Sequence, residues 1–150
     1  MQIVDYLSAE KIVTDLSSDD KYKIIEQLLD AVVASGSIRD RQNALHDLIE
    51  REAYLTTGLE NGLAIPHAKS EAVEEVTMAF GVHKEGLDFD SLDGDPTKYV
   101  FLLLSPMDTS GPHIKMLAKI ALNFQEDETL VKLSSAETPQ DFLKIFNEFK

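Results

Sequence analysis

The sequence predicts an α/β fold, with a mixed central sheet flanked by helices on both faces in a single layered domain over residues 1–150. Three observations support this prediction. Apolar residues recur at helical spacing near both ends of the chain, two short apolar segments rich in strand formers lie in the middle, and no repeat or linker divides the chain. Helices, then strands, then helices are typical of a layered α/β domain.

The first half of the chain carries the signals of two amphipathic helices. The polar run at residues 17–20 (SSDD) favours a helix start, and apolar residues over 24–33 then recur every three to four positions. Gly36 is placed to end this helix. A second helix is expected between Asp40, a candidate cap, and Gly58.

The middle of the chain predicts strands. A short buried strand is expected just before Pro66, and residues 76–82 (VTMAFGV) and 99–105 (YVFLLLS) are short and rich in strand formers. The last of these is apolar almost throughout, which is typical of a fully buried strand. The stretch between them, GLDFDSLDGDP (86–96), predicts a hairpin-like excursion.

The last third of the chain predicts helices. Residues 105–112 form a loop by composition, and a nearly all-apolar helix is expected from about residue 113 to 124. A short helical piece is expected near residues 126–133. A final helix is expected from Thr138 onward, where a cap precedes a proline in the first turn.

Composition narrows the classes of function. The chain has 27 acidic and 14 basic residues and a formal charge of −13. Such a surface repels nucleic acid and anionic membranes and favours a basic protein partner, although solubility alone would explain it equally well. No apolar run approaches the ~20 residues of a membrane span, and no signal peptide is evident, so a cytoplasmic protein without membrane insertion is expected.

Two of the four histidines stand in contexts that suggest chemistry. His46 and His83 are expected to have solvated or hydrogen-bonded structural roles. His67 follows Pro66, which fixes one backbone torsion and also restricts Ile65, so the backbone before the imidazole is stiff. A loop after a buried strand is a common place for a reactive group. The residues alone leave a functional and a structural role for His67 both open.

His113 and Arg51 are weaker candidates from the residues alone. His113 follows Gly-Pro at the expected start of a helix, where unpaired N–H groups offer donors to an anion. Packing of a half-buried ring explains it more simply. Arg51 lies at the edge of the core-facing stripe of the second helix, and it is equally explained as an ordinary surface arginine.

Motifs for other chemistries are missing from the sequence. It contains no HExxH, GxSxG, P-loop or GxGxxG pattern, no cysteine, and no carboxylate-rich loop with ligand spacing. Basic residues do not gather with aromatic residues into a nucleic-acid platform. Neither a metal centre nor a cofactor is therefore expected.

Residues 52–69, EAYLTTGLENGLAIPHAK, resemble the active-site signature of the fructose/mannitol/nitrogen-type enzyme IIA domains of the bacterial phosphoenolpyruvate-dependent phosphotransferase system. That signature runs from a helix through T-G-[hydrophobic] to G-x-A-[IV]-P-H-[AG], and this chain matches it throughout. Residues 87–96, LDFDSLDGDP, resemble the family's I-D-F-D-[AS]-L-D-G-x-P element. The resemblance covers essentially all 150 residues and implies the phosphotransferase/anion transport protein-like fold.

The resemblance implies roles for the three candidate residues. His67 would be phosphorylated by the phosphocarrier protein HPr, Arg51 would carry the role of the active-site arginine, and His113 would be the second active-site histidine. The loop MDTSGPH (107–113) departs from the family's usual acidic-then-T-H pattern. Neutral imidazole is a suitable phosphoryl carrier, because its nitrogen is nucleophilic near pH 7 and leaves readily once phosphorylated.

The resemblance leaves three functions open. The chain would pass phosphate to an enzyme IIB in fructose- or mannitol-type sugar uptake, or act as a nitrogen-type regulatory enzyme IIA that controls partner proteins without sugar transport. Ala68-Lys69 after the P-H pair resembles fructose-type members, whereas nitrogen-type members more often read P-H-G-R. The third possibility is a catalytically silent binding module that has kept the fold.

Overall fold

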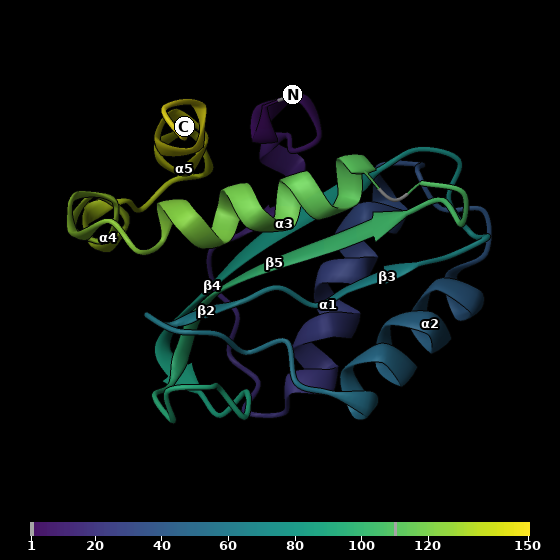
Figure 1. Cartoon of the computed structure of the whole chain (residues 1–150), viewed down its shortest axis with the longest axis horizontal. Coiled ribbons are helices and arrows are strands. Elements are labelled where there is room, and N and C mark those ends of the chain that lie inside the picture. Colours follow the sequence, from purple (N-terminus) through teal and green to yellow (C-terminus); the bar gives the residue numbers. More distant parts are fainter. Residues whose placement is uncertain (1, 110) are drawn as a thin grey trace.

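The computed structural model describes residues 2–109 and 111–150. A central sheet lies between two helical layers, so the predicted α/β architecture is confirmed (Figure 1). The helices α1 and α2 cover one face, while α3, α4, α5 and the N-terminal segment lie on the other. The bounds of the helices are Lys21–Ala34 (α1), Arg41–Tyr54 (α2), Gly111–Asn123 (α3), Asp127–Ser135 (α4) and Pro139–Asn147 (α5).

The sheet is mixed, as expected. Its order is β1-β4-β5-β2, and β3 also pairs with β5. The long central pair β4 and β5 is antiparallel, whereas β1, β2 and β3 run parallel to their neighbours. The bounds of the strands are Ile12–Val13 (β1), Leu63–Ala64 (β2), His67–Lys69 (β3), Thr77–Leu87 (β4) and Thr97–Ser105 (β5).

Alternation along the central strands fills two cores. Phe80 and Phe101 are fully buried on the face toward α3 and α5, where they pack against Phe146. Their neighbours Ala79 and Leu102 are buried on the face toward α1 and α2. Because successive strand residues point to opposite faces, both faces of β4 and β5 are apolar, as the almost uninterrupted apolar run of β5 predicts.

Helix ends lie close to the predicted signals. The side chain of Asp20 accepts a hydrogen bond from the backbone N–H of Tyr22, and that of Asp40 accepts one from Asn43. Thr138 forms a capping box with Asp141 at the start of α5. These side chains satisfy N–H groups that the first helical turn leaves unpaired.

Some boundaries differ from those expected. β4 continues past Val82 to Leu87, and its pairing with β5 is irregular over that stretch. α3 already includes Gly111, two residues before the expected start, and residue 110 of the predicted loop lies outside the described residues. The chain also begins with two short 3-10 helices, Ile3–Asp5 and Ala9–Lys11, which the sequence analysis did not identify. Within the described ranges, no helix is long and apolar enough to cross a membrane.

Candidate active site

His67 is the first residue of β3, on a sheet edge that is interrupted just before it. β2 ends at Ala64, and Pro66 separates it from β3, although both strands pair with β5. The expected loop after a strand is therefore a two-residue break between strands. Pro66 is buried, and its carbonyl accepts the N–H of Leu103, so the break is anchored to the sheet.

The tautomer of His67 follows from its hydrogen bond. Nδ1 of His67 lies 2.7 Å from the carbonyl oxygen of Ile65. A carbonyl oxygen only accepts, so Nδ1 carries the proton and the neutral ring keeps its lone pair on Nε2. Nε2 is thus the nucleophilic atom of this half-buried ring.

The second predicted histidine lies next to the first. The ring centroids of His67 and His113 are 5.3 Å apart, and the two planes are inclined by 58°. His113 is the third residue of α3, it is 6% exposed, and its Nδ1 is hydrogen-bonded to the hydroxyl of Ser105 at the end of β5. The departure from the family's loop pattern therefore leaves His113 beside His67.

Both imidazoles are kept neutral near pH 7. Burial lowers the pKa of His67; the Ile65 carbonyl partly opposes this shift, and the charge of Arg51 adds to it. Burial also lowers the pKa of His113, to about 4, and the charge that His67 gains on protonation and the charge of Lys69 add to the shift. Neutral rings suit a nucleophile and a hydrogen-bond donor better than a pair of imidazolium ions.

Arg51 lies in the last turn of α2, close enough to His67 to depress its pKa. Its Nη1 donates to the carbonyl of Leu55 at 2.6 Å, which also ties down the end of the helix. Lys69 lies two residues after His67, on the same face of β3, and its charge reaches His113. The structure therefore brings all three predicted residues together and adds a second cation.

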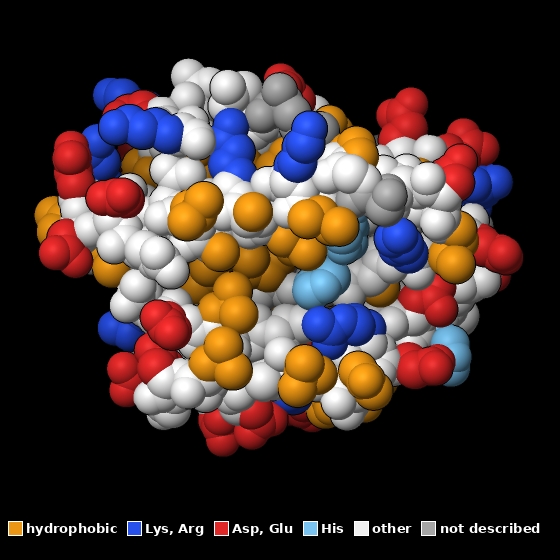
Figure 2. Space-filling view, in the orientation of Figure 1, with side chains coloured by type: hydrophobic (Ala, Val, Ile, Leu, Met, Phe, Trp, Pro, Cys, Tyr) orange, Lys and Arg blue, Asp and Glu red, His pale blue; other side chains and the backbone are white. Residues whose placement is uncertain are grey.

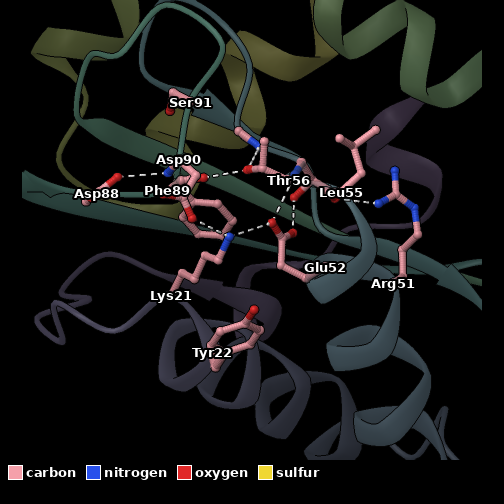
Figure 3. A network of polar contacts seen from close by, with 12 residues as sticks. Lys21, Tyr22, Arg51, Glu52, Leu55, Thr56, Asp88, Phe89, Asp90 and Ser91 are labelled. Carbon is pink, nitrogen blue, oxygen red and sulfur yellow. Dashed lines mark hydrogen bonds and ion pairs between the residues drawn. The ribbon is translucent and has the colours of Figure 1, made fainter.

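Glu52, the residue after Arg51, belongs to a largely buried ionic network that was not predicted from the sequence (Figure 3). The carboxylate of Glu52 accepts from Lys21 Nζ at 3.1 Å and from the N–H of Thr57 at 3.0 Å, and it also accepts from the Thr57 hydroxyl. Lys21 contacts Asp90 at 2.9 Å as well. Burial acts to lower the pKa of Lys21, but hydrogen bonds to Asp90 and Glu52 outweigh it and the pKa is raised.

The sequence holds a signal for this network. Glu52 follows Ala44 and Leu48 at four-residue spacing, so it lies on the apolar stripe of α2. A carboxylate on such a stripe indicates a buried, partnered charge. Ser105 could not be found in this way, since it simply ends an apolar strand and its contact with His113 depends on how α3 packs.

The other two histidines have local partners elsewhere. His46 is largely exposed and its Nε2 pairs with Glu50 at 2.8 Å along α2. His83 is buried in β4, and its Nε2 donates to the carbonyl of Ser18 at 3.1 Å. Neither ring needs a catalytic role to account for its position.

The surface beside the histidine pair is apolar on one side and basic on the other (Figure 2). Figure 2 shows two adjoining histidine side chains at the end of a hollowed band of hydrophobic side chains, with acidic side chains mostly further out. Leu55, which accepts from Arg51, and Met107 and Ile114, on either side of His113 in the chain, are 59%, 57% and 63% exposed. Exposed apolar side chains gathered beside reactive groups are typical of a protein-docking surface.

Comparison with known proteins places this arrangement in a family. The family model described as "Phosphoenolpyruvate-dependent sugar phosphotransferase system, EIIA 2" matches residues 5–149. The chain is 39% identical over 124 residues to the PTS system fructose-specific EIIA component of Haloferax volcanii, covering 83% of this chain and 80% of that protein.

Solved structures agree in fold. Nitrogen regulatory protein IIA-Ntr from Neisseria meningitidis superposes with a TM-score of 0.84 at 27% identity, covering 96% of this chain and 98% of that one. Enzyme IIA-Mtl from Escherichia coli, solved in complex with phosphorylated enzyme IIB-Mtl, has a TM-score of 0.79 at 17% identity over 93% of this chain and 95% of that one. The chain thus belongs to the EIIA 2 family of the phosphoenolpyruvate-dependent sugar phosphotransferase system.

Proposed function

We propose that this chain is a phosphoryl carrier in which Nε2 of His67 accepts a phosphoryl group from phospho-HPr and passes it to an enzyme IIB of a fructose- or mannitol-type uptake system. The observation that carries the proposal is the bond from Nδ1 of His67 to the Ile65 carbonyl, at 2.7 Å. It leaves the Nε2 lone pair available beside His113 and Arg51.

The transfer is a displacement at phosphorus. The bond between phosphorus and the donor atom of HPr breaks as the bond to Nε2 of His67 forms, and the proton stays on Nδ1, hydrogen-bonded to the Ile65 carbonyl, throughout. Once phosphorylated, the ring passes the group on by the same displacement toward the acceptor residue of enzyme IIB. Charge on the equatorial phosphoryl oxygens has to be stabilised in both directions.

Two neighbours supply that stabilisation. Arg51 presents a planar fork of N–H donors, of which the structure shows one bonded to Leu55. His113, neutral at pH 7, donates from Nε2 when the hydroxyl of Ser105 donates to its Nδ1. These donors lie at a partly closed site, where such interactions are stronger than in water.

The surface also suits its proposed partners. An apolar patch beside His67 would bury against HPr and then against enzyme IIB, and the formal charge of −13 would steer a basic donor surface toward it. A carrier has to release each partner quickly, so weak and fast complexes are expected. The Escherichia coli IIA-Mtl complex with phosphorylated IIB-Mtl supports the choice of acceptor.

A regulatory role is the second candidate. The similarity to nitrogen regulatory protein IIA-Ntr of Neisseria meningitidis extends over nearly the whole of both chains. In that role His67 would accept the same phosphoryl group, and its phosphorylation state would control partner proteins with no sugar transported. Phosphoryl transfer to a purified cognate enzyme IIB separates the two roles, because only the uptake role requires it.

The first test is phosphorylation in vitro. The wild-type protein and His67→Ala are each incubated with phosphoenolpyruvate, Enzyme I and HPr and followed by intact mass. We expect an acid-labile phosphate on the wild type only. Label on both proteins would transfer the carrier role to another residue, with His113 the next candidate, and no label on either from a competent HPr would favour a silent module.

A further inference from the structure

Helix dipoles disfavour both charges of the ion pair between Lys21 and Glu52. Lys21 is the first residue of α1, at the positive end of the helix dipole, and Glu52 lies in the last turn of α2, at the negative end. The Glu52 side chain is 0% exposed and that of Lys21 is 11% exposed. A buried ion pair is a weak source of stability, so another role is worth seeking for it.

A continuous path of hydrogen bonds leads from this pair to the reactive ring. Glu52 accepts both the N–H and the hydroxyl of Thr57. The carbonyl of Thr57 accepts the N–H of Ile65 at 3.1 Å. The carbonyl of Ile65 accepts Nδ1–H of His67 at 2.7 Å. Each hydrogen bond holds in place the residue that forms the next hydrogen bond along the path.

The path of hydrogen bonds matters because it favours the tautomer that a free histidine ring disfavours. A free neutral histidine side chain favours the proton on Nε2, which would block the atom that has to attack phosphorus. The Ile65 carbonyl reverses that preference only while it stays within reach of Nδ1. Pro66 restricts the backbone between them and anchors the chain after Ile65 to Leu103, whereas the N–H of Ile65 itself is held by the carbonyl of Thr57.

We infer that Glu52, with Lys21 as its counter-ion, is a positioning residue that holds Thr57 and Ile65 in place and so keeps Nε2 of His67 unprotonated. The inference rests on the proposed carrier role of His67. Glu52 touches neither His67 nor the phosphoryl group in this account; it acts through Thr57 and Ile65. The role of the pair is thus to set the tautomer of His67.

Glu52→Gln is the direct test, since glutamine keeps the shape but loses the charge that Lys21 neutralises. Two readouts are compared: the ¹⁵N chemical shifts of the His67 ring, which report which nitrogen carries the proton, and the rate of phosphorylation of His67. We expect the Nε2–H tautomer to appear and the rate to fall about ten- to a hundredfold, the loss typical of outer partners that orient an imidazole.

Two further variants guard against a trivial loss of fold. Thr57→Val removes only the hydroxyl contact with Glu52 and leaves the backbone path intact, so a smaller shift in the same direction is expected. Asp90→Asn changes the exposed end of the network, where the Asp90 side chain is 68% exposed and pairs with Lys21, and it should leave both readouts unchanged. Thermal unfolding of each variant accompanies the measurements.

The outcomes are distinguishable. Glu52→Gln with the wild-type tautomer would overturn the inference, whatever its rate, and so would a tautomer shift without any change in rate. If wild-type His67 is not phosphorylated by a competent HPr, the carrier role itself fails, and that result appears in the wild type before any variant is compared.

Discussion

The rings of His67 and His113 lie 5.3 Å apart between centroids although one opens a strand and the other sits in the first turn of a helix. Their hydrogen bonds differ in kind. Nδ1–H of His67 donates a hydrogen bond to a backbone carbonyl, whereas Nδ1 of His113 is hydrogen-bonded to a serine hydroxyl, which is able to donate to it. The two Nε2 atoms are therefore suited to opposite tasks, one to attack phosphorus and the other to donate to its oxygens.

Replacing His113 should slow transfer without abolishing it. In His113→Gln we expect phosphorylation of His67 to be about a hundredfold slower, which is the cost of losing one donor to a developing oxyanion. A time course of intact mass measures the rate, with His46→Gln as the exposed control. Complete loss of label in His113→Gln would give that ring a larger role than donation.

The guanidinium of Arg51 should be irreplaceable by an ammonium group. Arg51→Lys keeps the charge but loses the planar fork, and we expect transfer to fall at least about tenfold. Arg41→Lys, at the other end of the same helix and paired with Glu26 and Asp30, is the matched control. Equal rates for Arg51→Lys and the wild type would mean that charge alone suffices.

The pKa of His67 should respond in opposite directions to its two charged neighbours. The Glu52 carboxylate favours imidazolium and raises the pKa, while Arg51 disfavours imidazolium and lowers it. Glu52→Gln should therefore lower the pKa of His67, and Arg51→Gln should raise it. An NMR titration between pH 4 and pH 8 measures both, and shifts of the same sign in the two variants would contradict the assignment.

Acid should destabilise the protein through His113. Burial and the neighbouring cations lower its pKa to about 4 in the folded chain, against about 6.5 when unfolded. The unfolded chain thus binds the proton first as the pH falls. The contribution of neutral His113 to the free energy of unfolding is fully present above pH 6.5 and is lost toward pH 4. Solvent screening limits this contribution to about 1–2 kcal/mol.

Urea unfolding at pH 7.5 and pH 4.5 tests this linkage. Between pH 7.5 and pH 4.5, the free energy of unfolding should fall by about 1–2 kcal/mol more in the wild type than in His113→Gln. An equal loss in wild type and His113→Gln would rule out the buried ring as the source.

Gly58 should not accept a side chain. A Cβ there would lie 2.7 Å from the carbonyl oxygen of Phe89 and 2.9 Å from the hydroxyl of Ser91. We expect Gly58→Ala to lower the free energy of unfolding by about 1–3 kcal/mol, the usual cost of overpacking. Gly111→Ala, in α3, where a Cβ would meet no described atom within 4 Å beyond its own helical turn and chain neighbours, should leave stability unchanged or slightly raised; thermal melts compare the two.

Local patterns carried much of the fold. The apolar stripe of α1 predicts its buried face, and Asp20, Asp40 and Thr138 cap the helices that they were expected to cap. These features depend on neighbours within one or two turns, which is the range over which sequence periodicity acts. The end of β4 was missed because His83 to Gly86 are not apolar, and the strand continues across an irregular stretch between the paired residues Val82 and Leu87.

In the candidate site, too, only the features set by neighbouring residues could be predicted from the sequence. The stiff Pro66-His67 pair could be identified from local sequence, but the meeting of His67 with His113 and Arg51 came only from the family resemblance and then from the geometry. Glu52 is paired with Lys21 of α1, which in turn contacts Asp90 in the loop before β5, and no local rule joins segments so far apart. Burial of a carboxylate on an apolar stripe was visible in the sequence; its counter-ion was not.

The break between β2 and β3 has a consequence for how the protein behaves in a crowded solution. An unbroken edge strand offers a row of unpaired amides to which other chains can add, and this is a common origin of aggregation. Here the border that β2 and β3 form is made of pieces only two or three residues long, and it is interrupted by a proline that has no N–H to offer. The interruption that turns a carbonyl toward the reactive imidazole also leaves no continuous template for a foreign strand.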